Sequence, residues 1–203
     1  MASASDKRPG RHYQPEALVE ACGQTVFVLL DRDHVTAALA VIQSAGAAGE
    51  LDCTRCGNSL LHVAAHAGLH QVCSALLGKS GLPSDPRDWR GKTPLHIAAA
   101  KGHAQTCAAL VDGKADVEAR DTSGWCPLHC AAAHGRLEAC RVLLERGSPV
   151  GATVTGSGTT ALEIAEEAGN QKLIALFKYA PSKHVTDMAP VRGQRPSANE
   201  FDL

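Results

Sequence analysis

Aromatic residues are scarce in this chain of 203 residues: Phe, Trp and Tyr together make up only 3% of it. The core of a globular domain usually depends on several buried aromatic side chains. The apolar residues here are mostly Ala, Leu, Val and Cys. This composition disfavours a single large core and favours thin layers of small, closely packed helices.

The chain also lacks an excess of one charge and any long apolar run. Its net charge is −1 at pH 7 with neutral histidines. Nucleic-acid binding normally needs a basic excess or stripe, so we expect no nucleic-acid partner. No segment approaches the roughly 18 consecutive apolar residues of a membrane span, so we expect no membrane association.

The first 15 residues are polar and lack the apolar region of a secretory signal. Proteins that are not exported usually keep their thiols reduced. We therefore interpret the eight cysteines as free thiols and expect a cytosolic or nuclear protein.

Two series of glycines recur along the chain with nearly the same period. The first comprises Gly57, Gly91, Gly124 and Gly158, which are 34, 33 and 34 residues apart. The second follows eleven residues later, at Gly68, Gly102, Gly135 and Gly169. Two aligned series with one shared period indicate an internal repeat.

The second unit illustrates how the repeat should fold. Gly91 lies in a turn-rich stretch, where glycine adopts backbone angles that other residues resist. Thr93 can cap a helix, and Pro94 fits its first turn because the missing N–H is not needed there. The pattern predicts a short helix from about Pro94 to Lys101 that ends near Gly102.

A second helix should follow in the same unit. Cys107, Leu110 and Val111 form an apolar stripe with helical spacing, and the helix should stop near Gly113. Each unit is then a turn followed by two antiparallel helices, which bury their apolar faces only by stacking on neighbouring units.

The motif Thr-Pro-Leu-His-Ile-Ala at residues 93–98 resembles the ankyrin-repeat signature T-P-L-H-x-A, which recurs about every 33 residues. It is nearly complete at residues 126–131 and degenerate at 59–64, and in the last unit Glu163 replaces the histidine. The resemblance implies an all-α ankyrin-repeat solenoid of stacked helix-turn-helix units with β-turn or hairpin fingers.

The resemblance also implies a domain organisation. We expect a disordered tail in residues 1–15, a degenerate N-terminal cap repeat in 16–51, ankyrin repeats in 52–180 and a disordered tail in 181–203. The four repeats should span about 52–87, 88–120, 121–153 and 154–180. In the cap repeat, placing residues 33–34 on 102–103 aligns Val41 and Ile42 with Leu110 and Val111.

Lys114 stands where the family usually has glycine. Either Gly113 shifts the helix end by one residue, or Lys114 adopts a left-handed backbone at a cost of about 1 kcal/mol.

Three histidines, His62, His96 and His129, occupy the motif position once per repeat. One metal ion could not reach all three, because stacked units place them about one repeat apart. In the ankyrin family this histidine hydrogen-bonds backbone groups of the turn and of the neighbouring repeat. We therefore interpret the three residues as structural.

The cysteines offer few candidates for chemistry. Cys73, Cys107 and Cys140 each follow the second glycine by five residues, where the last unit has Ile174, so we predict a row of core thiols.

Two other cysteine groups are candidate metal or redox sites. Cys53 and Cys56 form a CxxC pair, but a redox site would need a βαβ setting and a zinc site a second ligand pair. Cys126, Cys130 and His134 share helical spacing, yet the two cysteines replace a capping Thr and a core residue. We predict no metal at either place.

The common motifs of enzymes are absent: there is no G-x-G-x-x-G, P-loop, H-E-x-x-H or G-x-S-x-G. The repeats use almost the whole ordered chain, which leaves no separate catalytic domain. We therefore predict that the protein is not an enzyme and needs no cofactor and no small-molecule substrate.

In ankyrin-repeat proteins, the turn tips and the exposed residues of the first helices line one concave surface. The resemblance implies that this surface binds a protein partner. The matching positions here are Asn58, His66, Trp89, Arg90, Lys92, Lys101, Thr122, Ser123, Trp125 and His134. Trp and Arg most often carry binding energy. We interpret Trp89 as a contact residue, and Trp125 as one that both packs and contacts.

The function predicted from these observations is a protein-protein interaction module, as a scaffold, an adaptor or a subunit of an assembly. One alternative is a small inhibitor or assembly chaperone of a kinase or ATPase complex, by analogy of architecture. A second is a thiol or zinc sensor using Cys53 and Cys56. Residues 199–203 could also act as a peptide ligand for a PDZ-like domain.

Overall fold

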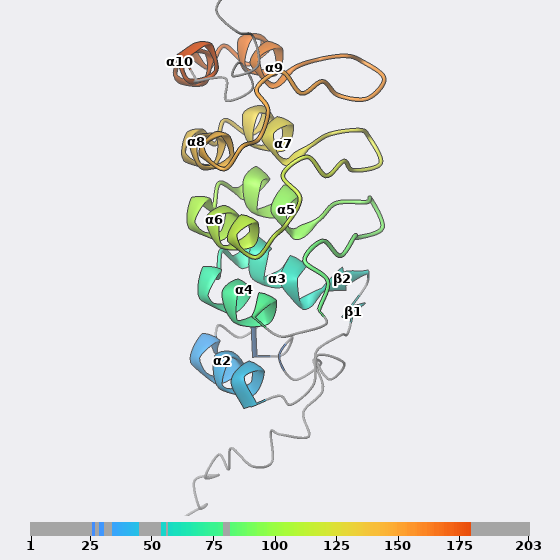
Figure 1. Ribbon diagram of the computed structural model, residues 1–203, viewed down its shortest axis with the longest axis vertical. Coiled ribbons are helices and arrows are strands. Elements are labelled where there is room, and N and C mark those ends of the chain that lie inside the picture. Colours follow the sequence, from blue (N-terminus) through green and yellow to red (C-terminus); the bar gives the residue numbers. More distant parts are fainter. Residues whose placement is uncertain are drawn as a thin grey trace, which may run out of the picture.

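The structure is a computed structural model, and it describes residues 26, 29, 30, 34–44, 54, 55, 57–78 and 82–179. Its helices are stacked in pairs (Figure 1). In chain order the elements are α2 (Val35–Ser44), β1 (Thr54–Arg55), β2 (Asn58–Ser59), α3 (Leu60–Ala67), α4 (His70–Leu77), α5 (Pro94–Lys101), α6 (Ala104–Asp112), α7 (Pro127–Ala133), α8 (Leu137–Glu145), α9 (Ala161–Glu167) and α10 (Gln171–Tyr179).

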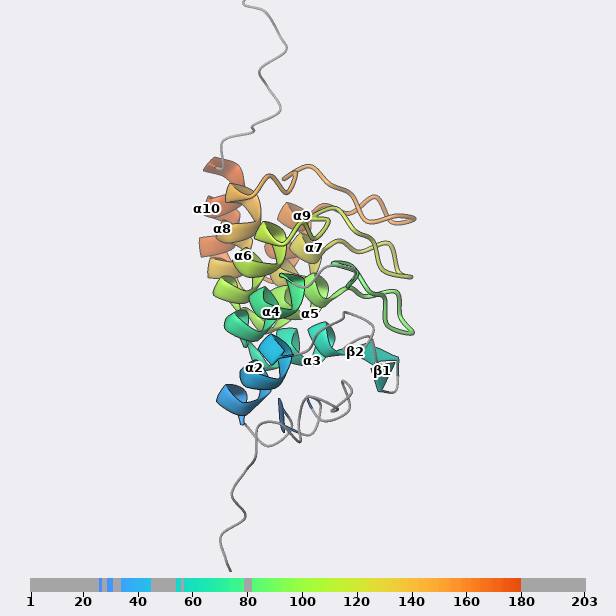
Figure 2. The same ribbon diagram turned by 60° about the horizontal axis from the view of Figure 1, so that its bottom comes forward.

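The helices form two parallel rows. In the inner row, α5 packs against α3 and α7, and α7 packs against α9. In the outer row, α6 packs between α4 and α8, α8 contacts α10, and α2 contacts α4. The connections between repeats project as fingers from the side of the inner row (Figure 1, Figure 2). This arrangement confirms the predicted all-α solenoid of helix-turn-helix units.

The inner helices end one or two residues before a glycine of the second series. α5 spans Pro94–Lys101 and is followed by Gly102 in a left-handed conformation, with φ of 87°. The N–H of His103 then donates to the carbonyl of Ala98 at 3.0 Å. Equivalent bonds close the inner helices of the other three repeats, at Leu69, Arg136 and Asn170. Glycine is needed at this position because residues with a Cβ atom resist the left-handed backbone.

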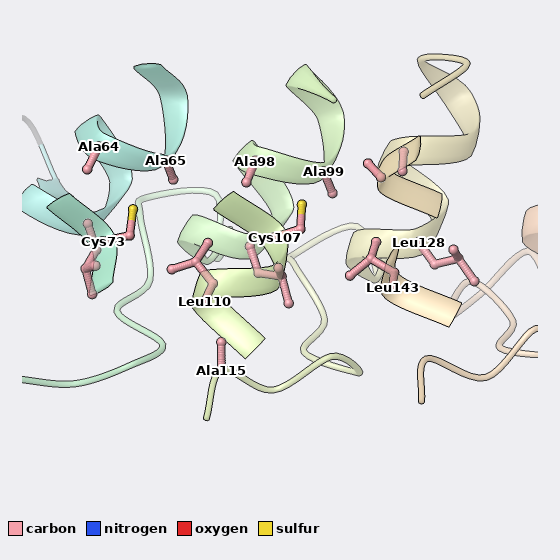
Figure 3. Packing of buried hydrophobic residues seen from close by; sticks show 14 of the residues in the cluster. Ala64, Ala65, Cys73, Ala98, Ala99, Cys107, Leu110, Ala115, Leu128 and Leu143 are labelled. Carbon is pink, nitrogen blue, oxygen red and sulfur yellow. The ribbon is translucent and has the colours of Figure 1, made fainter. Parts of the chain in front are cut away.

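The core between the rows is built mainly of Ala, Leu, Val and Cys side chains, as the composition indicated. In Figure 3, Ala98 and Ala99 of α5 lie next to α6, which carries Cys107 and Leu110. Cys73, Cys107 and Cys140 are fully buried, which confirms the predicted row of core thiols. Burial raises the pKa of all three thiols to about 12, so they are protonated and unreactive at neutral pH.

The fingers contain little β-structure. β1 and β2 form an antiparallel hairpin in which Thr54 pairs with Ser59 and Arg55 with Asn58. In the finger before α9, a single bridge joins Thr153 and Thr160. The other fingers are held by hydrogen bonds from side chains, which are described below.

The structure shows which residue after α6 adopts the left-handed conformation, a choice that the sequence left open between Gly113 and Lys114. Lys114 is left-handed, with φ of 70°, whereas Gly113 has φ of −78°. Gly113 cannot be replaced by a larger residue without displacing Leu77, because an added Cβ atom would overlap its side chain. Close packing therefore requires the glycine at 113, and Lys114 bears the left-handed strain of about 1 kcal/mol.

The N-terminal layer follows the predicted register where it is described. The N–H of His34 donates to the carbonyl of Leu29 at 2.9 Å, which is the equivalent of the bond between His103 and Ala98. Val41 and Ile42 are buried against α4. The rest of the cap repeat in 16–51, the tails 1–15 and 181–203, the cysteines Cys53 and Cys56 and the peptide 199–203 lie outside the described residues, so the domain boundaries stay predictions.

Among the described helices, none is long and apolar enough to cross a bilayer.

Candidate functional site

Two finger tips, those before α5 and α7, are each organised by one aspartate. Asp88 Oδ1 accepts hydrogen bonds from the N–H groups of Arg90 and Lys92, both at 2.8 Å. In the next repeat, Asp121 Oδ1 accepts from the N–H groups of Ser123 at 2.9 Å and Trp125 at 3.0 Å. Aspartate stabilises turns in this way because its short side chain reaches amides two to four residues ahead. The tips are therefore held in a defined shape.

Two arginines join successive fingers. The Nη1 group of Arg87 donates to the carbonyl of Gly91 in its own finger at 3.1 Å and to the carbonyl of Arg120 in the next at 2.6 Å. Arg120 repeats the pattern, with Gly124 at 2.9 Å and Thr153 at 2.6 Å. Hydrogen bonds from a charged donor are stronger than neutral ones. The fingers are thus linked along the stack.

Trp89 and Arg90 form the most prominent pair at a tip. The Trp89 side chain is 71% exposed, and the Arg90 guanidinium lies 4.2 Å from the centre of its ring, which is within the range of a cation–π interaction. The backbone beneath is fixed, because the carbonyl of Arg90 accepts from the N–H of Thr122 at 3.0 Å and from its Oγ1 at 2.9 Å. The pair therefore presents a large exposed surface on a rigid base.

The other predicted contact residues differ in exposure. Trp125 is half-buried and meets the ring of His129 edge-on, with 6.3 Å between ring centres. Asn58, in β2, and Lys92 are also half-buried, whereas Thr122 and Ser123 are exposed at their tip. The remaining three, His66, Lys101 and His134, are exposed at or just after the C-terminal ends of α3, α5 and α7.

Two residues at the ends of the inner helices were missed by the sequence analysis. His103 Nε2 donates to the carbonyl of His66 at 3.2 Å, and Arg136 Nε donates to the carbonyl of Ala100 at 3.1 Å. Each lies over the second glycine of the preceding repeat, where an added Cβ atom would be 2.8 Å from the nearest atom of His103 or Arg136. Both residues directly follow a glycine of the second series, and this shared position was the signal in the sequence that could have identified them.

The motif histidines connect consecutive repeats. His96 Nδ1 accepts from the N–H of Thr93 at 3.2 Å, and its Nε2 donates to the carbonyl of Trp125 at 2.9 Å. His62 and His129 make the equivalent bonds to the carbonyls of Lys92 and Ala152. An Nδ1 that accepts and an Nε2 that donates define a neutral ring. These three histidines therefore serve as links between layers.

Burial is the largest cause that lowers the pKa of His62, His96 and His129 below the usual 6.5. The unfolded chain then takes up protons before the folded chain does, so the free energy of unfolding should fall as the pH drops below about 6.5. We expect a lower urea midpoint at pH 5.5 than at pH 7.5. The difference between the two midpoints should be smaller in the variant His129→Gln, because one of the three buried histidines is removed. An equal or higher midpoint at pH 5.5 would contradict this interpretation.

A family model for ankyrin repeats, described as three copies, matches residues 21–121 and again 114–187. These matches include every described helix. The chain belongs to the ankyrin-repeat family. A comparison with curated proteins finds no match. Ankyrin repeats are generally protein-interaction modules, and the family is typically non-catalytic.

The described cysteines of this ankyrin-repeat protein are unsuited to metal binding. Cys126 and Cys130 are buried, and burial raises the pKa of Cys130 to about 12. The exposed His134 directs Nδ1 to the carbonyl of Cys130 at 2.9 Å. Across the part of the chain that the structure describes, no cluster of three or more His, Cys, Asp or Glu side chains could hold a metal ion.

Proposed function

We propose that this ankyrin-repeat protein is a scaffold, an adaptor or an assembly subunit that holds a protein partner on its finger-side face. This face comprises the finger tips and the exposed residues of the inner row. The observation that carries the proposal is the exposed Trp89–Arg90 pair on its fixed backbone. Because the tip is already fixed, it loses little conformational freedom when a partner buries this pair, and this favours affinity.

The links between fingers support the same proposal. Arg87 and Arg120 tie three successive fingers together through backbone carbonyls, and Thr122 ties its tip to Arg90. A surface that is ordered before binding costs less entropy to use. The cytosolic or nuclear location expected from the sequence remains a prediction.

The test is a comparative pull-down from extracts of the native cell, analysed by mass spectrometry. One bait is the unmodified chain, and the second is Trp89→Ala/Arg90→Ala/Lys92→Ala. The matched control is Tyr179→Ala/Arg141→Ala/Lys172→Ala, which removes one exposed aromatic and two exposed basic residues from the outer row. Circular dichroism checks that all three baits are folded.

We expect one protein to be captured by the unmodified chain and the control but lost with the tip variant. A partner captured equally by all three baits would refute the finger-side site. The identity of the partner separates an adaptor from a regulator, since a kinase or an ATPase subunit would favour the latter.

A further inference from the structure

The charges that build the fingers balance one another. Asp88 and Asp121 are engaged with turn amides, and Arg87 and Arg120, which precede them, are engaged with carbonyls. Each of these two finger frameworks therefore contributes one carboxylate and one guanidinium. Any net charge at the tips has to come from other residues.

Three further cations lie on the same face. Arg90, Lys92 and Lys101 form no ion pair with any residue in the described ranges, whereas Arg141 pairs with Glu138 and Glu145 on the outer row. Arg90 and Lys101 are exposed, and Lys92 is half-buried. An unpaired cation at the edge of an interface attracts acidic groups of a partner.

These cations belong to one region that runs from the tip across the inner row. The bond from His103 Nε2 to the carbonyl of His66 at 3.2 Å brings the end of α5, where Lys101 lies, beside the end of α3. Lys92 lies two residues before α5, and its carbonyl accepts a hydrogen bond from His62 Nε2 of α3 at 2.9 Å. We call Arg90, Lys92 and Lys101, which lie at the tip before α5 and near the two ends of this helix, the basic patch.

The last repeat reverses the sign of the charge. Glu163, Glu166 and Glu167 of α9 are all exposed, and this inner helix carries no basic residue. Lys178 pairs with Glu166 at 3.1 Å, and neither Glu163 nor Glu167 forms an ion pair with a residue that the structure describes. The finger-side face therefore carries the basic patch around α5 and exposed carboxylates at α9.

We propose that the partner segment that docks on the basic patch is an acidic stretch of polypeptide. This inference rests on the proposed function and adds the chemistry of the ligand. The segment places its carboxylates between the tip at Arg90 and the end of α5 at Lys101. It is short, because a long polyanion such as a nucleic acid would run onto the carboxylates of α9, where like charges repel.

The test uses the full chain and two fluorescein-labelled peptides, one of alternating Glu and Gly and the other of alternating Gln and Gly. Fluorescence anisotropy measures the Kd at low and at physiological ionic strength. The acidic peptide should bind at least about tenfold more tightly than the neutral one. Its affinity should fall at the higher ionic strength because salt screens exposed charges.

A charge-matched pair of variants locates the site. Arg90→Gln/Lys101→Gln should weaken binding of the acidic peptide by about tenfold. Arg141→Gln/Lys172→Gln changes the net charge equally on the outer row and should leave the Kd unchanged. Equal weakening by both variants, no preference for the acidic peptide or no binding would overturn the proposal. Tighter binding of a single-stranded oligonucleotide of equal charge would also overturn it.

The two proposals fail separately. If the tip variant loses its cellular partner but the acidic peptide shows no preference, only the acidic segment is refuted. If the tip variant retains the partner, the finger-side site is refuted, and with it the docking of an acidic segment there.

Discussion

Replacing His96 with leucine should lower the free energy of unfolding by about 3 kcal/mol. The two side chains are similar in size, so the core stays filled, but the hydrogen bonds of the ring to Thr93 and to Trp125 are lost. Thr93 is fully buried, and its N–H donates to His96 Nδ1, so the substitution leaves this amide without a partner. Burying an unpaired amide costs about as much as losing both bonds.

The measurement for His96→Leu is urea unfolding followed by circular dichroism. His66→Leu is the matched control, because His66 is exposed and its ring makes no hydrogen bond within the described part of the chain. The control should unfold within about 0.5 kcal/mol of the unmodified protein. A loss below about 1 kcal/mol in His96→Leu would show that the ring is not a structural link.

Replacing Gly124 with alanine should also destabilise the protein by about 3 kcal/mol. Gly124 has φ of 76°, and alanine in this conformation costs about 1 kcal/mol. In addition, the new Cβ atom would lie 2.5 Å from Thr155 Cβ and 2.8 Å from Thr155 N. The finger before α9 would have to move away, and such overpacking costs about 1–3 kcal/mol.

Gly158 provides the matched control because it is the equivalent glycine of the last repeat. Its φ is 73°, but a Cβ atom there would meet nothing within 4 Å. Gly158→Ala should therefore cost only the backbone strain of about 1 kcal/mol. If both alanine variants are equally stable in urea, the close approach of the fingers contributes nothing to stability.

The sequence predicted the parts of the fold that depend on local chemistry. The bounds of α5, from Pro94 to Lys101, follow from proline at the start and glycine after the end. The core thiols were recognised because Cys73, Cys107 and Cys140 share one place in the period. These features repeat, so each copy supports the assignment of the others.

The contacts between repeats were harder to predict, because they depend on the spacing of the layers. Nothing local indicated that Arg87 would reach the carbonyl of Arg120, or that Arg136 would cover the end of α5. The sequence could not decide for the same reason whether Gly113 or Lys114 is left-handed, because that depends on Leu77 in the preceding repeat. A contact between side chains of two layers can be predicted only when the positions of both layers are known.

The bonds between repeats have a consequence for how the chain changes over generations. Arg87, Arg120, His62, His96 and His129 all reach across to main-chain carbonyls. Every amino acid supplies a carbonyl, so the acceptor survives almost any substitution in the neighbouring unit. A duplicated or deleted stretch of about 33 residues would therefore meet partners that already fit, and the length of the array can evolve separately from the residues at its tips.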